Sequence, residues 1–184
     1  MKVIRLFKHE TDLIARAVKN NRQAQHQLYQ QYSPKMLSVC RMYIKDVHQA
    51  EEAMLNGFFK VFQYLKNFKN EGSFEGWVRK IMVRECLSYI RQQRTIYFEE
   101  VDEQETEADY STMNTTMDTE YIQQLIDELP EGYKIVFVMY AIEGYKHHEI
   151  AEALGIEVGT SKSQLSKARK LLQQNLAKQQ EQAT

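Results

Sequence analysis

The sequence predicts an all-α protein with two small helical domains, residues 1–95 and 119–184, joined by a flexible acidic linker at 96–118. Seven glycines and only two prolines in 184 residues leave little material for tight hairpins. Several long segments instead carry apolar residues three and four positions apart, the spacing of an amphipathic helix. A chain of this length, 43% hydrophobic, can form two domains with a modest core each.

Charge is distributed unevenly along the chain, although the formal net charge is only −1. Residues 1–95 carry 17 Lys and Arg against 8 Asp and Glu, whereas residues 96–128 carry 11 acids and no base. Residues 129–184 are nearly balanced, with 7 bases and 6 acids. This distribution favours polyanion binding by the first part and a solvated tether after it. The alternative is that the charges only solvate helix surfaces.

Four helices are predicted in the first domain. The first begins near Thr11, and the second covers about residues 28–43, with Pro34 in or near a first turn. The third extends from Asp46 to Leu65, and the fourth from about Phe74 to Arg94. Their apolar stripes are expected to form one core.

The acidic stretch separates these helices from a second helical group. Residues 97–120 contain few aliphatic side chains and no sustained period, which predicts a linker without fixed structure. The next two helices are expected to be separated at Pro130, because proline disfavours helix in the residue before it and can open the next one. Gly144 is expected to end the second of them.

A helix-turn-helix is predicted from Glu149 to Leu172. Ala151 lets a second helix pack closely, and Gly155, four residues later, permits the sharp turn. The recognition helix would begin near Val158. Its inner face is expected to carry Leu165, Ala168 and Leu172. Its outer face is expected to carry hydroxyl, amide and cationic groups, namely Thr160, Lys162, Ser163, Gln164, Ser166, Lys167, Arg169 and Lys170.

Side chains of these types suit a helix that enters a major groove, where they contact base edges and phosphates. An ordinary solvent-exposed surface is the alternative reading of the same pattern. The helix-turn-helix therefore makes DNA the first candidate partner.

Other classes of protein find little support in the sequence. No run of about 18 apolar residues occurs and the N-terminus has no signal-peptide core, so we expect a cytoplasmic protein. Cys40 and Cys86 stand alone, which argues against a zinc site or a disulfide framework. His147-His148-Glu149 lacks the second histidine of a metalloprotease motif, and no glycine-rich phosphate loop occurs. We therefore expect no enzyme activity, no cofactor and no small-molecule substrate.

Two blocks of sequence resemble the conserved domains of bacterial extracytoplasmic-function (ECF) sigma factors. Residues 129–172, LPEGYKIVFVMYAIEGYKHHEIAEALGIEVGTSKSQLSKARKLL, resemble the last domain of that family. Residues 27–91 resemble the other domain, with paired helices, an acidic-then-aromatic segment and a G-S-F-x-x-W-x-x-x-I helix.

The resemblance implies a dissociable specificity subunit whose partners are core RNA polymerase and promoter DNA. The first domain would bind core polymerase and melt the minus-ten element, and the last would read the minus-thirty-five element. The tether would pass near the polymerase active-site cleft. Family members are commonly held inactive by an anti-sigma factor, which is therefore a further expected partner.

The resemblance also implies roles for residues of the recognition helix and of the first domain. Base- and phosphate-facing positions are Lys162, Ser163, Gln164, Ser166 and Lys167, with Thr160 and Arg169 as backbone contacts. The segment KNFKNEGS corresponds to the loop that captures a flipped base, with DNA contacts at Lys66, Asn67, Lys69 and Ser73. The helix after it would face DNA through Lys80 and Arg84, one turn apart.

Aromatic residues beside that loop and one helix face complete the assignment. Phe68 or Phe74 could stack on a base or simply pack, and Trp77 is expected in the core. The face that docks on the polymerase corresponds to Glu51, Glu52, Leu55, Asn56 and Phe59.

Several of these positions depart from the family pattern. Leu55 and Asn56 stand where Gln and an acid are usual, and Arg84, Ser161 and Gln164 stand where Asn, an apolar residue and Arg are usual. Promoter sequence therefore cannot be transferred from other members. Two alternatives stay open: a stand-alone helix-turn-helix transcriptional regulator, and a helical adaptor that docks through Phe58, Phe59 and Phe62.

Overall fold

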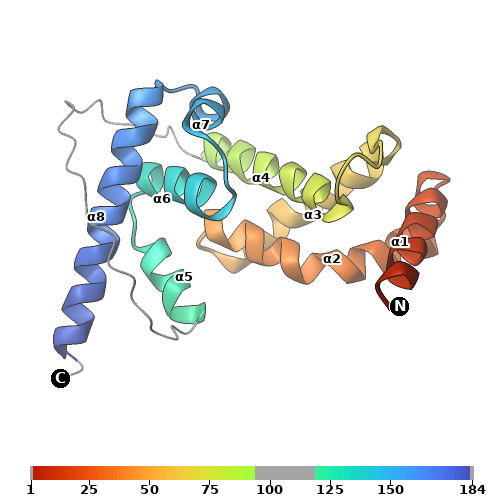
Figure 1. Ribbon diagram of the computed structural model, residues 1–184, viewed down its shortest axis with the longest axis horizontal. Helices are drawn as coiled ribbons and strands as arrows, with labels where there is room; N and C mark the ends of the chain where they lie inside the picture. The colour runs from red at the N-terminus through yellow and green to blue at the C-terminus, as the bar shows by residue number, and fades with distance from the viewer. Residues whose placement is uncertain (1, 94–118, 183–184) are drawn as a thin grey trace. The chain divides into compact units, whose positions relative to one another are not determined.

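The computed structural model describes residues 2–93 and 119–182, and this part of the chain is helical without any strand (Figure 1). The all-α fold class is therefore confirmed. The chain divides into two compact units, Met1–Arg94 and Thr95–Thr184. The predicted linker at 96–118 lies outside the described residues.

Residues 2–93, the described part of the N-terminal unit, contain four α-helices and one short 3₁₀ turn. They are α1 (Lys2–Val18), α2 (Arg22–Tyr43), α3 (Val47–Tyr64), η1 (Leu65–Asn67) and α4 (Phe74–Gln93). Helices α2, α3 and α4 pack against one another, and α1 packs on α2 and η1. Their buried stripes join Leu28, Met36, Leu65, Val78 and Met82 in one apolar core.

Side chains fix where these helices begin. The carboxamide of Asn21 accepts a hydrogen bond from the Ala24 N–H at 2.9 Å, and the carboxylate of Asp46 accepts one from the Gln49 N–H at 2.9 Å. Such caps satisfy backbone donors that have no partner inside the helix.

Two expectations about this unit were wrong. The first helix begins at Lys2, not near Thr11. Pro34 lies well inside α2 and not in a first turn, because α2 already begins at Arg22. The apolar stripe of α2 continues on both sides of the proline, with Tyr32 and Met36 buried. Packing of that stripe outweighs the helix-interior cost of proline, about 3 kcal/mol.

The C-terminal unit is built around one long helix. It contains α5 (Thr119–Asp127), α6 (Glu131–Phe137), the π-helical segment η2 (Val138–Ile142), α7 (His147–Leu154) and α8 (Val158–Gln182). Helix α8 packs against α5, α6 and α7. As predicted, the chain breaks at Pro130, and Gly144 and Gly155 adopt left-handed conformations with φ of 76° and 70°.

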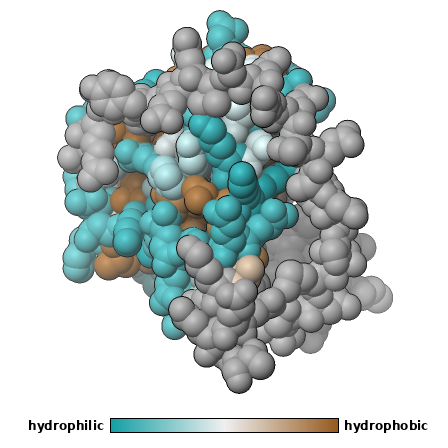
Figure 2. All heavy atoms as spheres, turned by 90° about the vertical axis from the view of Figure 1, so that its left-hand side faces the viewer, coloured by the Kyte–Doolittle hydropathy of each residue, from teal (hydrophilic) through white to brown (hydrophobic). Residues whose placement is uncertain are grey.

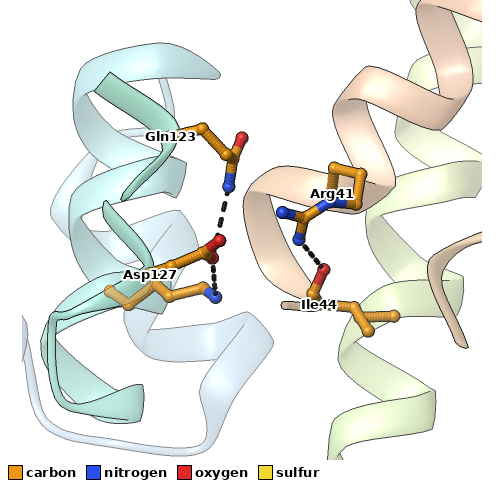
Figure 3. Close-up of polar contacts among 5 residues, drawn as sticks. Arg41, Ile44, Gln123 and Asp127 are labelled. Carbon is orange, nitrogen blue, oxygen red and sulfur yellow. Dashed lines mark hydrogen bonds and ion pairs between the residues drawn. The ribbon is translucent and has the colours of Figure 1, made fainter. Parts of the chain in front are cut away.

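A buried ion pair joins the first two helices of this unit. The Lys134 ammonium on α6 lies 3.1 Å from the Asp127 carboxylate at the end of α5, and these side chains are 7% and 8% exposed (Figure 3). Gln123 also donates to the same Asp127 oxygen, at 3.2 Å. A separate contact in the N-terminal unit, also drawn in Figure 3, has the Arg41 guanidinium donating to the Ile44 carbonyl at 2.6 Å.

Among the helices of the described ranges, none combines the length and the apolar character that a membrane span requires.

Candidate nucleic-acid interface

Helices α7 and α8 form the predicted helix-turn-helix. Ala151 on α7 is buried, and the Ile156 N–H donates to the Ala151 carbonyl at 3.0 Å across the turn at Gly155. The start of α7 is held by the Glu149 carboxylate, which accepts from the Lys146 N–H at 2.8 Å. The Lys146 side chain cannot accept a hydrogen bond from a backbone N–H of α7 in turn, since an ammonium group has no acceptor. The turn at Gly155 thus joins α7 to α8, the helix that was predicted to be the recognition helix.

The outer face of α8 carries six of the seven DNA contacts that were predicted for this helix. Lys162 and Ser166 are exposed, and Thr160, Ser163, Lys167 and Arg169 are partly exposed. Among the coloured residues of Figure 2, hydrophilic side chains predominate, with hydrophobic patches between them. The outward placement of these six residues leaves them accessible to a DNA groove.

Two cations on this face are oriented by aromatic rings. The Lys167 ammonium lies 5.6 Å from the centre of the Tyr133 ring, and the Arg169 guanidinium lies 5.6 Å from that of Tyr140. Cation–π contacts of this length restrict long, flexible side chains at modest energy. The side chains of Lys167 and Arg169 are therefore partly preorganised.

Gln164 does not lie on the outer face, and that prediction was wrong. Its side chain is only 1% exposed, and its Oε1 atom has no hydrogen-bond partner among the described residues. Ser161, Gln164, Leu165 and Ala168 are all buried, at the i, i+3, i+4, i+7 spacing of one helix stripe. Leu172, expected on the inner face, is only partly buried. The inward stripe lies further toward the N-terminus of α8 than predicted.

Sequence reasoning also missed His147. Its Nδ1 atom lies 2.9 Å from the Ser161 hydroxyl, and its ring stacks on Tyr140 with centroids 4.6 Å apart. Burial lowers the pKa of His147, and the positive charges of Lys162 and Arg169 lower this pKa further. Ser161 could have indicated this contact. It stands where the family has an apolar residue, and a hydroxyl that is buried there requires a polar partner.

The loop between α3 and α4 is anchored by aromatic side chains. Phe68 packs edge-on against Phe74, with centroids 5.2 Å apart, and lies 5.5 Å from Trp77. Phe74 is buried, so it packs and does not stack on a base. Trp77, which was expected in the core, is only partly buried. Asn70 and Gly72 in this loop have positive φ angles of 57° and 97°.

The predicted DNA contacts of the N-terminal unit are all exposed. In the loop these are Lys66, Asn67, Lys69 and Ser73, and on α4 they are Lys80 and Arg84. The Ser73 hydroxyl accepts from the Gly76 N–H at 3.0 Å, so it also caps the start of α4. Lys80 and Arg84 lie one turn apart on the same face of the helix.

The predicted polymerase-docking face is a continuous exposed strip along α3. It contains Glu51, Glu52, Leu55, Asn56 and Phe59. Leu55 is 54% exposed and Phe59 is 71% exposed, so this strip presents two large apolar side chains one helical turn apart. Phe58, in contrast, is buried and packs against Tyr29 with ring centroids 4.9 Å apart. The aromatic face of the adaptor alternative is therefore not presented to solvent as one patch.

Two family models match the chain, one on each unit. Sigma-70 region 2 matches residues 28–96, and Sigma-70 region 4 matches residues 119–172. The chain belongs to the sigma-70 family of RNA polymerase sigma factors, as its similarity to ECF members also indicates.

Curated relatives support this membership. The chain is 27% identical over 161 residues to the ECF RNA polymerase sigma factor SigE of Mycolicibacterium smegmatis, covering 83% of this chain but 61% of that protein. It is 25% identical over 158 residues to SigW of Bacillus subtilis, covering 79% of this chain and 84% of SigW. It is 24% identical over 173 residues to the sigma-E factor of Escherichia coli, covering 87% and 90%.

Solved structures share the fold. The sigma factor RpoE from Bartonella quintana, in complex with the anti-sigma factor NepR, aligns with a TM-score of 0.54 at 19% identity, covering 83% of this chain and 96% of that one. CnrH in complex with the cytosolic domain of CnrY aligns with a TM-score of 0.50 at 19% identity, covering 90% of this chain and 95% of that one.

Proposed function

We propose that this chain is an ECF-type sigma factor that directs core RNA polymerase to specific promoters and initiates transcription. The observation that carries the proposal is the exposed hydroxyl and cationic strip on the recognition helix α8 of a region 4 match, in a chain that also has a region 2 match. The chain would contribute binding and strand separation in the cytoplasm, while polymerisation belongs to the core enzyme. The two similar structures, which are complexes named with NepR and CnrY, support an anti-sigma factor as a further partner.

The C-terminal unit would read the minus-thirty-five element. Lys162, Ser163, Ser166 and Lys167 would contact base edges and phosphates, and Thr160 and Arg169 would position the helix on the backbone. Gln164 is removed from this set because its side chain is buried.

The N-terminal unit would melt the minus-ten element and hold the polymerase. The loop Lys66, Asn67, Lys69 and Ser73 would receive a flipped base, with Lys80 and Arg84 on the strand backbone. The exposed strip on α3 would dock on the core enzyme, with Phe59 as the apolar anchor and Glu52 at its polar edge.

The direct test is transcription in vitro with purified core polymerase, followed by mapping of start sites. We expect specific initiation only when the protein is added. Initiation that is the same with and without the protein would refute the proposal. Tight, specific binding to duplex DNA without polymerase would instead support the stand-alone regulator.

The recognition helix is tested by Lys162→Ala, with Lys19→Ala as a control that removes an exposed cation outside the interface. Loss of one good base contact costs about 1–3 kcal/mol, so promoter binding by the holoenzyme should weaken about 5- to 150-fold. Core binding should be unchanged. Equal transcription by both variants would refute the assignment of α8.

The α3 strip is tested by Phe59→Ala, with Tyr64→Ala as the matched control. Tyr64 is also a large exposed side chain of α3, 48% exposed, but it lies on another side of the helix. Co-purification with core polymerase should fall for Phe59→Ala and persist for Tyr64→Ala. Undiminished co-purification of Phe59→Ala would refute the docking face.

A further inference from the structure

His147 is the first residue of α7, and its ring is held between two other elements of the C-terminal unit. On one side its Nδ1 atom lies 2.9 Å from the hydroxyl of Ser161, which is fully buried in the first turns of α8. On another side the ring stacks on Tyr140 of η2, with an interplanar angle of 25°. These contacts fix the orientation of the ring, which is partly exposed.

The Ser161 contact is compatible with both charge states of the imidazole. A serine hydroxyl either donates to a bare Nδ1 or accepts from a protonated one, so the contact survives protonation of the ring. Nε2 is then the nitrogen that remains available, since it has no hydrogen-bond partner among the described residues. In the imidazolium form this atom is a charged N–H donor.

The groups around His147 are mostly positive. Helix α8 contributes Lys162 and Arg169, the two cations that act on the ring, and η2 contributes the uncharged Tyr140. Its neighbours along the chain are Lys146, which caps α7, and His148 and Glu149 within α7. The Glu149 carboxylate accepts a hydrogen bond from the Lys146 N–H. Burial first, and then the charges of Lys162 and Arg169, lower the pKa of His147 in the free protein.

We propose that His147 is a phosphate-binding residue whose doubly protonated, imidazolium form donates from its Nε2–H to the promoter backbone, so that promoter binding takes up a proton at this ring. This inference rests on the proposed function of α8. In helix-turn-helix proteins the first helix crosses the DNA backbone while the second lies in the major groove. The first residue of α7, next to the recognition helix, is therefore placed where a phosphate passes.

The direction of the pH effect follows from the charges. A phosphate at Nε2 favours the charged ring, and phosphates at Lys162 and Arg169 offset the repulsion that disfavours it in the free protein. The pKa of His147 is thus higher in the complex than in the free protein. Affinity for the promoter rises as the pH falls from above the higher pKa to below the lower one, and becomes constant on either side.

The test measures promoter affinity of the holoenzyme between pH 8 and pH 6 for the wild type, His147→Gln and His148→Gln. His148 is the adjacent, exposed histidine of the same helix turn and serves as the matched control. The double variant H147F/S161V replaces the ring and its buried hydroxyl partner with apolar groups, in case His147→Gln impairs folding. Every pKa unit of difference between complex and free protein corresponds to a factor of up to about ten in affinity.

We expect affinity to increase about three- to tenfold toward pH 6 for the wild type and His148→Gln, and this increase to be lost in His147→Gln and in H147F/S161V. At pH 6 the promoter affinity of both His147 variants should also fall less steeply with salt concentration than that of the wild type, by the amount expected for about one lost phosphate contact. Variants without His147 that keep the wild-type pH and salt dependence overturn this inference alone. Absence of promoter-specific complexes at every pH overturns the proposed function, and the inference with it.

Discussion

The two units of this protein are stabilised in different ways. The core of α1–α4 is apolar and aromatic, as in the contact of Tyr32 with Phe74, whose ring centroids lie 5.4 Å apart. Apart from tyrosines and cysteines, the described residues with a buried polar or charged side chain all belong to the C-terminal unit, and they are Lys134, Ser161 and Gln164. The smaller helices of that unit, with α5, α6 and α7 only 9, 7 and 8 residues long, have less apolar surface to bury.

This difference in core polarity predicts which substitutions each unit tolerates. An apolar core accepts changes that keep its volume, because dispersion contacts have little directionality. A core with polar groups depends on each group keeping its partner, because a buried charge or amide left alone costs its full desolvation. Removing one polar partner should therefore damage the C-terminal unit more than a methyl-sized change damages the N-terminal one.

Lys134→Met should have the largest effect. It removes the ammonium group that lies 3.1 Å from the Asp127 carboxylate, in a site only 8% exposed. Breaking a buried ion pair in this way costs about 3–5 kcal/mol. Chemical denaturation followed by circular dichroism should show the transition of the C-terminal unit moving to lower denaturant. The double variant K134M/D127L should recover most of the loss, and equal stability of Lys134→Met and wild type would contradict the polar-core interpretation.

Gly57→Ala should have a smaller effect, in the N-terminal unit. A Cβ atom at Gly57 on α3 would lie 2.3 Å from the sulfur of Met82 on α4, and Met82 is fully buried. Overpacking of this kind costs about 1–3 kcal/mol, from which the helix propensity of alanine recovers about 1 kcal/mol. In a Met82→Ala background the sign should reverse, and Gly57→Ala should stabilise. Destabilisation of the same size in both backgrounds would show that the Met82 contact is not its cause.

Gln164→Leu should have the smallest effect, and an opposite sign. Its Oε1 atom is buried without a hydrogen-bond partner among the described residues, and an apolar side chain of similar length removes that cost. We expect stabilisation of the C-terminal unit by about 1 kcal/mol, with unchanged promoter binding, measured by denaturation and by transcription in vitro. A stable variant that has lost promoter recognition would return Gln164 to the set of base contacts.

Much of the fold could be predicted because local signals and apolar periodicity agree with the packing. Asp46, Pro130, Gly144 and Gly155 mark boundaries that the structure has. Pro34 was wrongly placed near a helix start because proline favours the first turn of a helix. The apolar stripe of α2 begins earlier than predicted and keeps the proline inside the helix. The tertiary packing of α2 therefore outweighs the local preference of proline at this position.

The candidate site could be predicted less completely. Exposure along α3 and α8 follows from helical spacing, so Phe59 and Lys162 lie on open surfaces as expected. Gln164 was misplaced because amides usually avoid the interior, and residue type was given more weight than the i, i+3, i+4, i+7 spacing. His147 was missed as a partner of Ser161 because their 14-residue separation spans a turn whose geometry only the structure shows.

The aromatic anchor of the loop between α3 and α4 gives the protein a built-in optical probe. Trp77 is the only tryptophan in the chain, and its ring lies 5.5 Å from that of Phe68. Emission excited at the red edge of the indole band therefore originates beside the segment 66–73. A rearrangement of that segment on single-stranded DNA would change the emission maximum without any attached dye, so strand capture could be followed in real time on the unmodified protein.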